Sequence, residues 1–135
     1  MFRCVKLVQL AILAVIGVFL LSMPVPRANA AELIMLEEAG CWWCEKWNKE
    51  IGVVYHKTPE GRLAPLRRVD IHERLPVDLQ FLNKGRYTPT FVLIEEGREY
   101  GRIRGYPGED FFWGWLGQML ERLPKKRSNI TETSN

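Results

Sequence analysis

The residues whose chemistry stands out are two cysteines separated by two tryptophans, Cys41-Trp42-Trp43-Cys44. Cysteines at this spacing can close a small disulfide ring with little rearrangement of the chain. If the motif opens a helix, Cys41 lies beside unpaired backbone N–H groups and the positive end of the helix dipole. The pKa of a thiol in that position falls, so it becomes a nucleophile near neutral pH. The motif predicts thiol–disulfide exchange, with Cys41 attacking and Cys44 resolving the mixed disulfide.

The segments on either side of the motif predict a strand before it and a helix after it. Residues 33–37 begin with four apolar residues and are predicted to form a strand. The apolar run ends there, and the residues up to Gly40 are predicted to break the strand. Residues 41–51 are predicted to form a helix with Gly52 as its C-terminal stop. A CxxC motif between a strand and a helix is a stronger redox signal than the motif alone.

The alternative for the two cysteines is a static structural disulfide. The loop between them is very short, and the stabilisation that a disulfide provides grows with the length of the loop it closes. A disulfide placed for stability would join distant segments instead. We therefore favour redox use of Cys41 and Cys44.

Residues 1–30 have the pattern of a secretory signal. Arg3 and Lys6 make a basic start, residues 7–23 are mostly apolar, and Ala28-Asn29-Ala30 offers small residues to a signal peptidase. We expect cleavage after Ala30 and an exported protein. An uncleaved membrane anchor is the alternative, although the apolar run is shorter than the roughly 20 residues of a membrane span.

Removing the signal changes the charge and the cysteine count. The 19 basic residues less Arg3, Lys6 and Arg27 leave 16, which match the 16 acidic residues. A formally neutral chain gives no case for nucleic-acid binding. Cys4 leaves with the signal, so the mature chain keeps only the two motif cysteines, in a compartment where disulfides form.

No metal or other cofactor is expected. The two histidines, His56 and His72, are too far apart for the usual spacing of a zinc site with two cysteines. Covalent haem needs a histidine directly after the second cysteine, where this chain has Glu45. We expect both histidines on the surface or in turns.

The rest of the chain predicts a single domain over residues 31–123 and a polar, flexible tail over 124–135. An apolar stripe at helical spacing after Glu109 is expected to pack on the sheet. Residues 58–61 are predicted to form a turn. The other predicted elements are a strand at 66–71, a short helix at 77–83, strands at 90–94 and 99–104 joined by a hairpin at 95–98, and the helix with the stripe Phe112, Trp115, Leu116, Met119, Leu120 and Leu123.

The order of these elements, together with Thr88-Pro89 directly before a strand, resembles the thioredoxin superfamily. The resemblance implies an α/β thioredoxin-like fold in its minimal βαβ–ββα form, with a central mixed sheet flanked by helices. It also implies that Pro89 is cis and lies against the disulfide. An ordinary trans proline that starts a strand is the alternative.

The Cys-Trp-Trp-Cys motif, the export signal and a Gly-Tyr-Pro-Gly loop at 105–108 are similar to the small periplasmic thioredoxins of bacterial sulfur-oxidation (Sox) gene clusters. That likeness implies a reductase of protein disulfides that receives electrons from a membrane thiol transporter. The chain departs from cytosolic thioredoxins, which have a buried acid where Met35 stands. Glu37 or Glu38 is the possible proton acceptor in its place.

Five further residues are expected to shape the substrate groove. The tryptophans bring no charge beside the cysteines, which favours a reducing protein, and at least one of them, Trp42 rather than Trp43, is expected to contact partner proteins. Thr88 would pair its backbone with an extended substrate. Gly105 and Tyr106 would complete the groove, unless they are a turn glycine and a core tyrosine.

We expect a monomer that acts on protein thiols and disulfides. Two other functions stay open from the sequence. The first is a periplasmic oxidase or isomerase that donates its disulfide. The second is a non-catalytic binding module in which the bond between Cys41 and Cys44 only shapes a docking surface.

Overall fold

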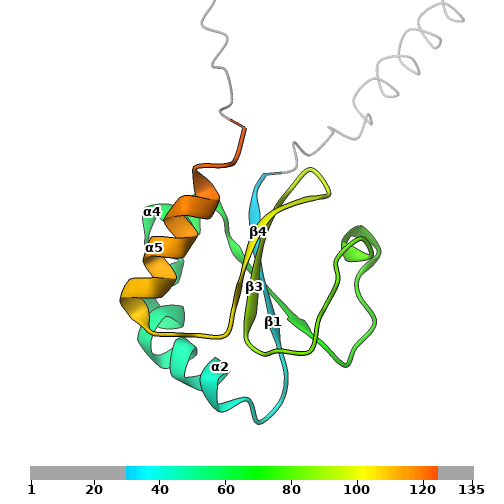
Figure 1. Ribbon diagram of the computed structural model, residues 1–135, viewed down its shortest axis with the longest axis horizontal. Helices are drawn as coiled ribbons and strands as arrows, with labels where there is room; N and C mark the ends of the chain where they lie inside the picture. The colour runs from blue at the N-terminus through cyan, green and yellow to red at the C-terminus, as the bar shows by residue number, and fades with distance from the viewer. Residues whose placement is uncertain (1–29, 125–135) are drawn as a thin grey trace, which may run out of the picture.

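The structure is a computed structural model that describes residues 30–124. The predicted signal and tail therefore lie, apart from Ala30 and Pro124, outside the described residues. Figure 1 shows a sheet with helices on one face and the segment between β2 and β3 on the other. The described elements are β1 (Glu32–Glu37), α2 (Trp42–Trp47), a π-helical segment η1 (Asn48–Gly52), α3 (Val53–Tyr55), α4 (Pro59–Leu63), β2 (Leu66–Asp70), a 3₁₀ turn η2 (Val77–Leu79), β3 (Thr90–Glu95), β4 (Arg98–Arg104) and α5 (Glu109–Leu120).

The four strands form one mixed sheet in the order β2-β1-β3-β4. Strand β2 runs parallel to β1, with Met35 opposite Arg68, and the helical segments from α2 to α4 make the crossover between them. The pairs β1–β3 and β3–β4 are antiparallel. This is the predicted βαβ–ββα order with a mixed sheet, and β4, predicted to be an exposed edge, is an edge strand.

Alternate residues of the central strands build two separate cores, one on each face of the sheet. On the helix face, Trp47 is fully buried among the rings of Tyr55, Phe91 and Phe112. The opposite face is covered by the β2–β3 segment. That second cluster consists of Ile34, Leu36, Val69, Leu79, Leu82, Val92 and Ile94.

Two predictions about the first half of the chain are wrong. Gly52 does not end the helix: it has helical backbone angles, and the helical path continues to Tyr55. A Cβ on Gly52 would lie 3.1 Å from the Trp47 ring, so this glycine allows the ring to pack against the backbone. Residues 58–61 are not an isolated turn, because the Thr58 hydroxyl caps α4 by accepting from the Gly61 N–H at 3.0 Å.

Two predictions about the second half also need correction. Of the helix predicted at 77–83 only the 3₁₀ turn η2 forms, with Leu79 and Leu82 buried and Val77 and Phe81 exposed. Trp115 does not belong to the buried stripe of α5, because its side chain is 43% exposed. Trp113, two residues earlier, packs on the core.

Among the elements of residues 30–124, no helix has the length and apolar character to cross a membrane.

Two glycines test this description of the packing. In Gly61→Ala the new Cβ would lie 1.9 Å from the Tyr55 carbonyl oxygen, so we expect a loss of about 1–3 kcal/mol or more in the free energy of unfolding. In Gly114→Ala the Cβ meets nothing within 4 Å, and alanine favours the α5 helix by about 0.5–1 kcal/mol. Urea unfolding of both variants measures the difference, and equal midpoints would contradict the packing around α4.

Candidate active site around Cys41 and Cys44

Cys41 and Cys44 form a disulfide at the start of α2, with their Cα atoms 5.2 Å apart. Cys41 is the N-cap of the helix: its Sγ accepts a hydrogen bond from the Cys44 backbone N–H at 3.1 Å. Its carbonyl accepts the next bond, from the Glu45 N–H at 3.1 Å. Cys41 therefore stands where the helix dipole and an N–H donor stabilise a sulfur anion.

The two sulfurs differ in exposure. Cys41 is partly exposed at the rim of the core, whereas Cys44 is 3% exposed and belongs to the buried cluster of the helix face. An incoming disulfide can reach Cys41 from solvent, and Cys44 is covered by the domain. This asymmetry fits the predicted roles of an attacking and a resolving cysteine.

Trp42 and Trp43 lie between the cysteines on the solvent side of α2. Their exposed fractions are 62% and 49%, and their rings meet edge to face at 4.6 Å. Large exposed aromatic side chains are enriched in protein interfaces. The two rings form an apolar surface beside the disulfide.

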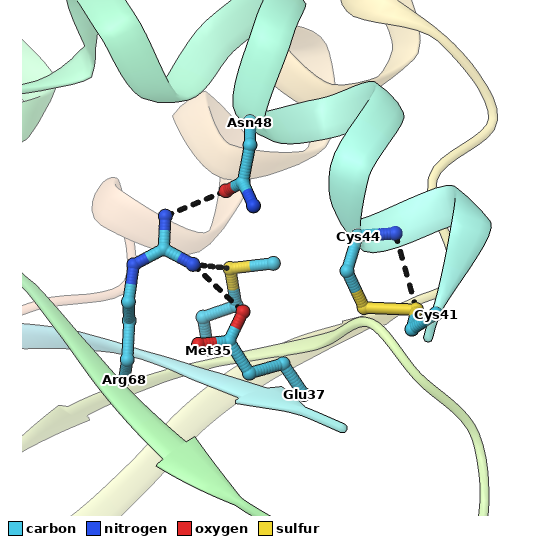
Figure 2. A network of polar contacts seen from close by, with 6 residues as sticks. All are labelled: Met35, Glu37, Cys41, Cys44, Asn48 and Arg68. Atoms are coloured by element: carbon cyan, nitrogen blue, oxygen red, sulfur yellow. Dashed lines mark hydrogen bonds and ion pairs between the residues drawn. A yellow bond between two sulfur atoms is a disulfide. The ribbon is translucent and has the colours of Figure 1, made fainter. Parts of the chain in front are cut away.

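A guanidinium joins the strands to the segment after α2. Arg68 donates hydrogen bonds to Glu37 Oε2 at 2.7 Å and to Asn48 Oδ1 at 2.6 Å, and one of its N–H groups lies 3.5 Å from the Met35 sulfur. Its Cζ also lies 5.9 Å from the centre of the Trp47 ring. In Figure 2 the Glu37 carboxylate turns toward Arg68, and the Met35 side chain lies between the guanidinium and the disulfide.

The other predicted acid, Glu38, takes part in a different network. Its Oε1 accepts from the Thr88 hydroxyl at 2.5 Å, and its Oε2 lies 2.9 Å from His72 Nε2. The bond from Thr88, and then the bond to His72, hold the pKa of Glu38 below its usual value. Glu38 thereby connects the end of β1 to the segment before β3.

The peptide bond between Thr88 and Pro89 is cis, the isomer that the resemblance implies. The Pro89 carbonyl accepts from the Gly105 N–H at 2.7 Å, which ties the segment before β3 to the end of β4. Gly105 has a φ of 80°, in the left-handed region that glycine adopts without strain. These residues therefore share one region of the fold.

Tyr106 is placed in the core rather than in an open groove. It is 3% exposed, and its hydroxyl donates to Glu50 Oε2 at 2.7 Å. Burial and this bond raise the pKa of Tyr106, and Lys46 and then Tyr106 lower the pKa of Glu50. Tyr106 supports the loop from inside and does not line its surface.

The sequence did not indicate that Arg68 and Asn48 belong to the site, or that His72 contacts Glu38. Residues 66–71 were predicted only as a strand, and His72 only as a surface residue. Arg68 lies opposite Met35 through the parallel pairing of β1 with β2, and no signal in the sequence gives that register. The part of the chain that the structure describes contains no group of three or more His, Cys, Asp or Glu side chains that could hold a metal ion.

Comparison with solved structures identifies the class of protein. The crystal structure of the reduced form of the periplasmic thioredoxin SoxS from Paracoccus pantotrophus matches with a TM-score of 0.65 and 42% identity, over 68% of this chain and 97% of that one. The chain therefore belongs to the thioredoxin family and is a thiol–disulfide oxidoreductase, and its redox group is its own disulfide.

Two more distant structures show the same fold. Thioredoxin (Mala s 13) of Malassezia sympodialis has a TM-score of 0.51 and 22% identity, over 68% of this chain and 76% of that one. The germline-specific thioredoxin Deadhead of Drosophila melanogaster has a TM-score of 0.52 and 16% identity, over 67% and 81%. No protein-family model and no curated protein matches the sequence.

The different surroundings of the two sulfurs predict different reactivity after reduction. Iodoacetamide should modify Cys41 at least about tenfold faster than Cys44, because only Cys41 combines access to solvent with a stabilised thiolate. Mass spectrometry of the two labelled peptides measures both rates. Unfolding in urea should make the rates similar, and similar rates in the folded protein would contradict the assignment.

Proposed function

We propose that the protein is a periplasmic reductase of protein disulfides, with Cys41 as its nucleophile. The observation that carries this proposal is the position of Cys41 as the accessible N-cap of α2, three residues before a buried Cys44. The similarity to a periplasmic thioredoxin supports the compartment. Residues 1–30 would be the export signal that is removed, and residues 31–123 the catalytic domain, followed by a flexible tail.

The reaction proceeds in two exchange steps. The Cys41 thiolate attacks one sulfur of the substrate, so that a Cys41–substrate bond forms and the other substrate sulfur leaves as a thiolate. Cys44 then loses its proton and attacks Cys41, which closes the ring disulfide and releases the second substrate thiolate. Two electrons pass to the substrate, and the enzyme must be reduced again, in our proposal by a membrane thiol transporter.

Glu37 is the better candidate of the two predicted proton acceptors for Cys44. Both carboxylate oxygens of Glu38 already have partners, Thr88 and His72. Glu37 uses Oε2 in its bond with Arg68, and among the described residues its Oε1 has no hydrogen-bond partner. A carboxylate oxygen without a partner can accept a proton.

The uncharged tryptophans favour a reducing protein. A cation beside the cysteines would stabilise the thiolate, and with it the reduced form, and would make the protein a stronger oxidant. Between Cys41 and Cys44 stand only indole rings. Arg68, the cation on the strand side, is paired with Glu37.

The reduction potential tests the direction of electron flow. We expect a value near that of thioredoxin, about −270 mV, for the protein without residues 1–30. Equilibration in dithiothreitol or glutathione redox buffers, followed by tryptophan fluorescence, gives the value. A potential near −120 mV, typical of strong oxidants, would contradict the reductase and indicate an oxidase or isomerase.

Trapping of mixed disulfides tests the mechanism. Cys44→Ser removes the resolving thiol, so covalent adducts with partner proteins should accumulate in a periplasmic extract and disappear with dithiothreitol. Cys41→Ser should form no adducts and lose all turnover. If the biological activity needed only binding, so that the Cys41→Ser protein bound its partner and replaced the wild type, the chain would act as a docking module instead.

The substrates are proposed to be protein disulfides, including those of sulfur-oxidation proteins, by analogy with the Sox-type thioredoxins. We propose that Trp42, with Trp43, contacts these proteins, and that Thr88, Pro89 and Gly105 line the groove that receives the substrate chain. The enzyme would act as a monomer. Proteins trapped by Cys44→Ser identify which disulfides it reduces.

A further inference from the structure

The side chain of Glu38 connects the end of β1 to the segment before β3 by a hydrogen bond with Thr88. It follows β1 directly, three residues before Cys41. Its two carboxylate oxygens contact the Thr88 hydroxyl, 50 residues away, and the His72 ring, 34 residues away. One side chain thus joins two distant segments to the turn that leads to Cys41.

Thr88 has free backbone groups and is bonded to Glu38, whose carbonyl accepts from the Cys41 N–H at 3.4 Å. Within residues 30–124, neither the N–H nor the C=O of Thr88 has a hydrogen-bond partner, although β3 begins only two residues later. Extended peptides bind by pairing with such groups. The hydroxyl of the same residue donates to Glu38, so that carboxylate helps to hold Thr88 and its free backbone groups in place.

We propose that Glu38 is a positioning residue for the substrate, with His72 as its support: it fixes Thr88 so that the Thr88 backbone pairs with an extended protein substrate beside Cys41. This inference rests on the proposed function. It assigns Glu38 to substrate binding and leaves the proton transfer at Cys44 to another group.

The exposure of the network agrees with a role in binding. The side chains of Glu38 and His72 are 33% and 71% exposed, so removing either one leaves no cavity in a packed core. His72 is held in place from its own segment, because its backbone N–H donates to Asp70 Oδ1 at 2.7 Å.

The test compares a protein substrate with a small disulfide. Variants Glu38→Ala and Thr88→Val are assayed with insulin, with dithiothreitol as the electron source, and with DTNB in a single turnover of the reduced protein, whose Cys41 and Cys44 thiols supply the two electrons. In both variants we expect KM for insulin to rise about tenfold while kcat stays within about twofold. DTNB has no extended chain, so its reduction should not change.

The coupling between the two residues gives a second readout. Because both variants break the same contact, the double variant should bind insulin no worse than either single variant. Glu38→Gln keeps an oxygen that can accept from Thr88 and should restore most of the affinity. His72→Gln should raise KM only about twofold to threefold, since it removes the support and not the contact itself.

Glu73→Gln is the matched control, since Glu73 is an exposed carboxylate one residue past His72 and its side chain has no hydrogen bond within the described chain. It should behave as the wild type. An unchanged KM in Glu38→Ala, a parallel loss with DTNB, or multiplied effects in the double variant would each overturn the positioning role. Failure of the wild type to reduce insulin would instead contradict the proposed function, and with it the substrate role of Thr88.

Discussion

The burial of Trp47 is the interaction on which the redox site depends. Helix α2 is a short segment at the edge of the domain, and a helix of this length is not stable alone. Its last residue packs an indole against the rings of Phe91 and Phe112, which belong to β3 and α5 and also contact each other. Because the far end of α2 is fixed in the core, its first turn is fixed at the surface. The Cys41 sulfur can then occupy the N-cap position with one solvent-facing side.

The order of the strands explains why the polar residues of the site meet. Strands β1 and β2 are parallel, so the residues that follow them emerge at the same end of the sheet. Strand β3 is antiparallel to β1, so the residues before it arrive at that end as well. Glu38, His72 and Thr88 are respectively the first residue after β1, the second after β2 and the second before β3. Their contact is a consequence of topology, and no local pattern in the sequence contains it.

The sequence predicted the strands, the CxxC helix start and the α5 helix because each has a strong local signal. Gly52 misled the prediction because a glycine can stop a helix or allow a ring to approach it, and only the position of Trp47 decides between the two. Trp115 was wrongly predicted to be buried for a similar reason: helical spacing alone placed it on the apolar stripe of α5, whereas Trp113 is the tryptophan that packs on the core. Arg68 was missed because a charged residue on a strand reads as solvent-facing. Its role depends on a pairing register that the sequence does not state.

The replacement of the buried acid by Met35 has an electrostatic consequence for the whole site. A carboxylate at position 35 would lie in the core, where an ion is costly to bury without a partner. A thioether avoids that cost, and the nearest acid and base of the strands, Glu37 and Arg68, stand at the half-exposed rim as a pair. The charge of the guanidinium is then cancelled beside the cysteines rather than directed at them. The Cys41 thiolate is then stabilised by the N–H groups at the start of α2. These groups, more than any charged side chain, determine the reactivity of this dithiol.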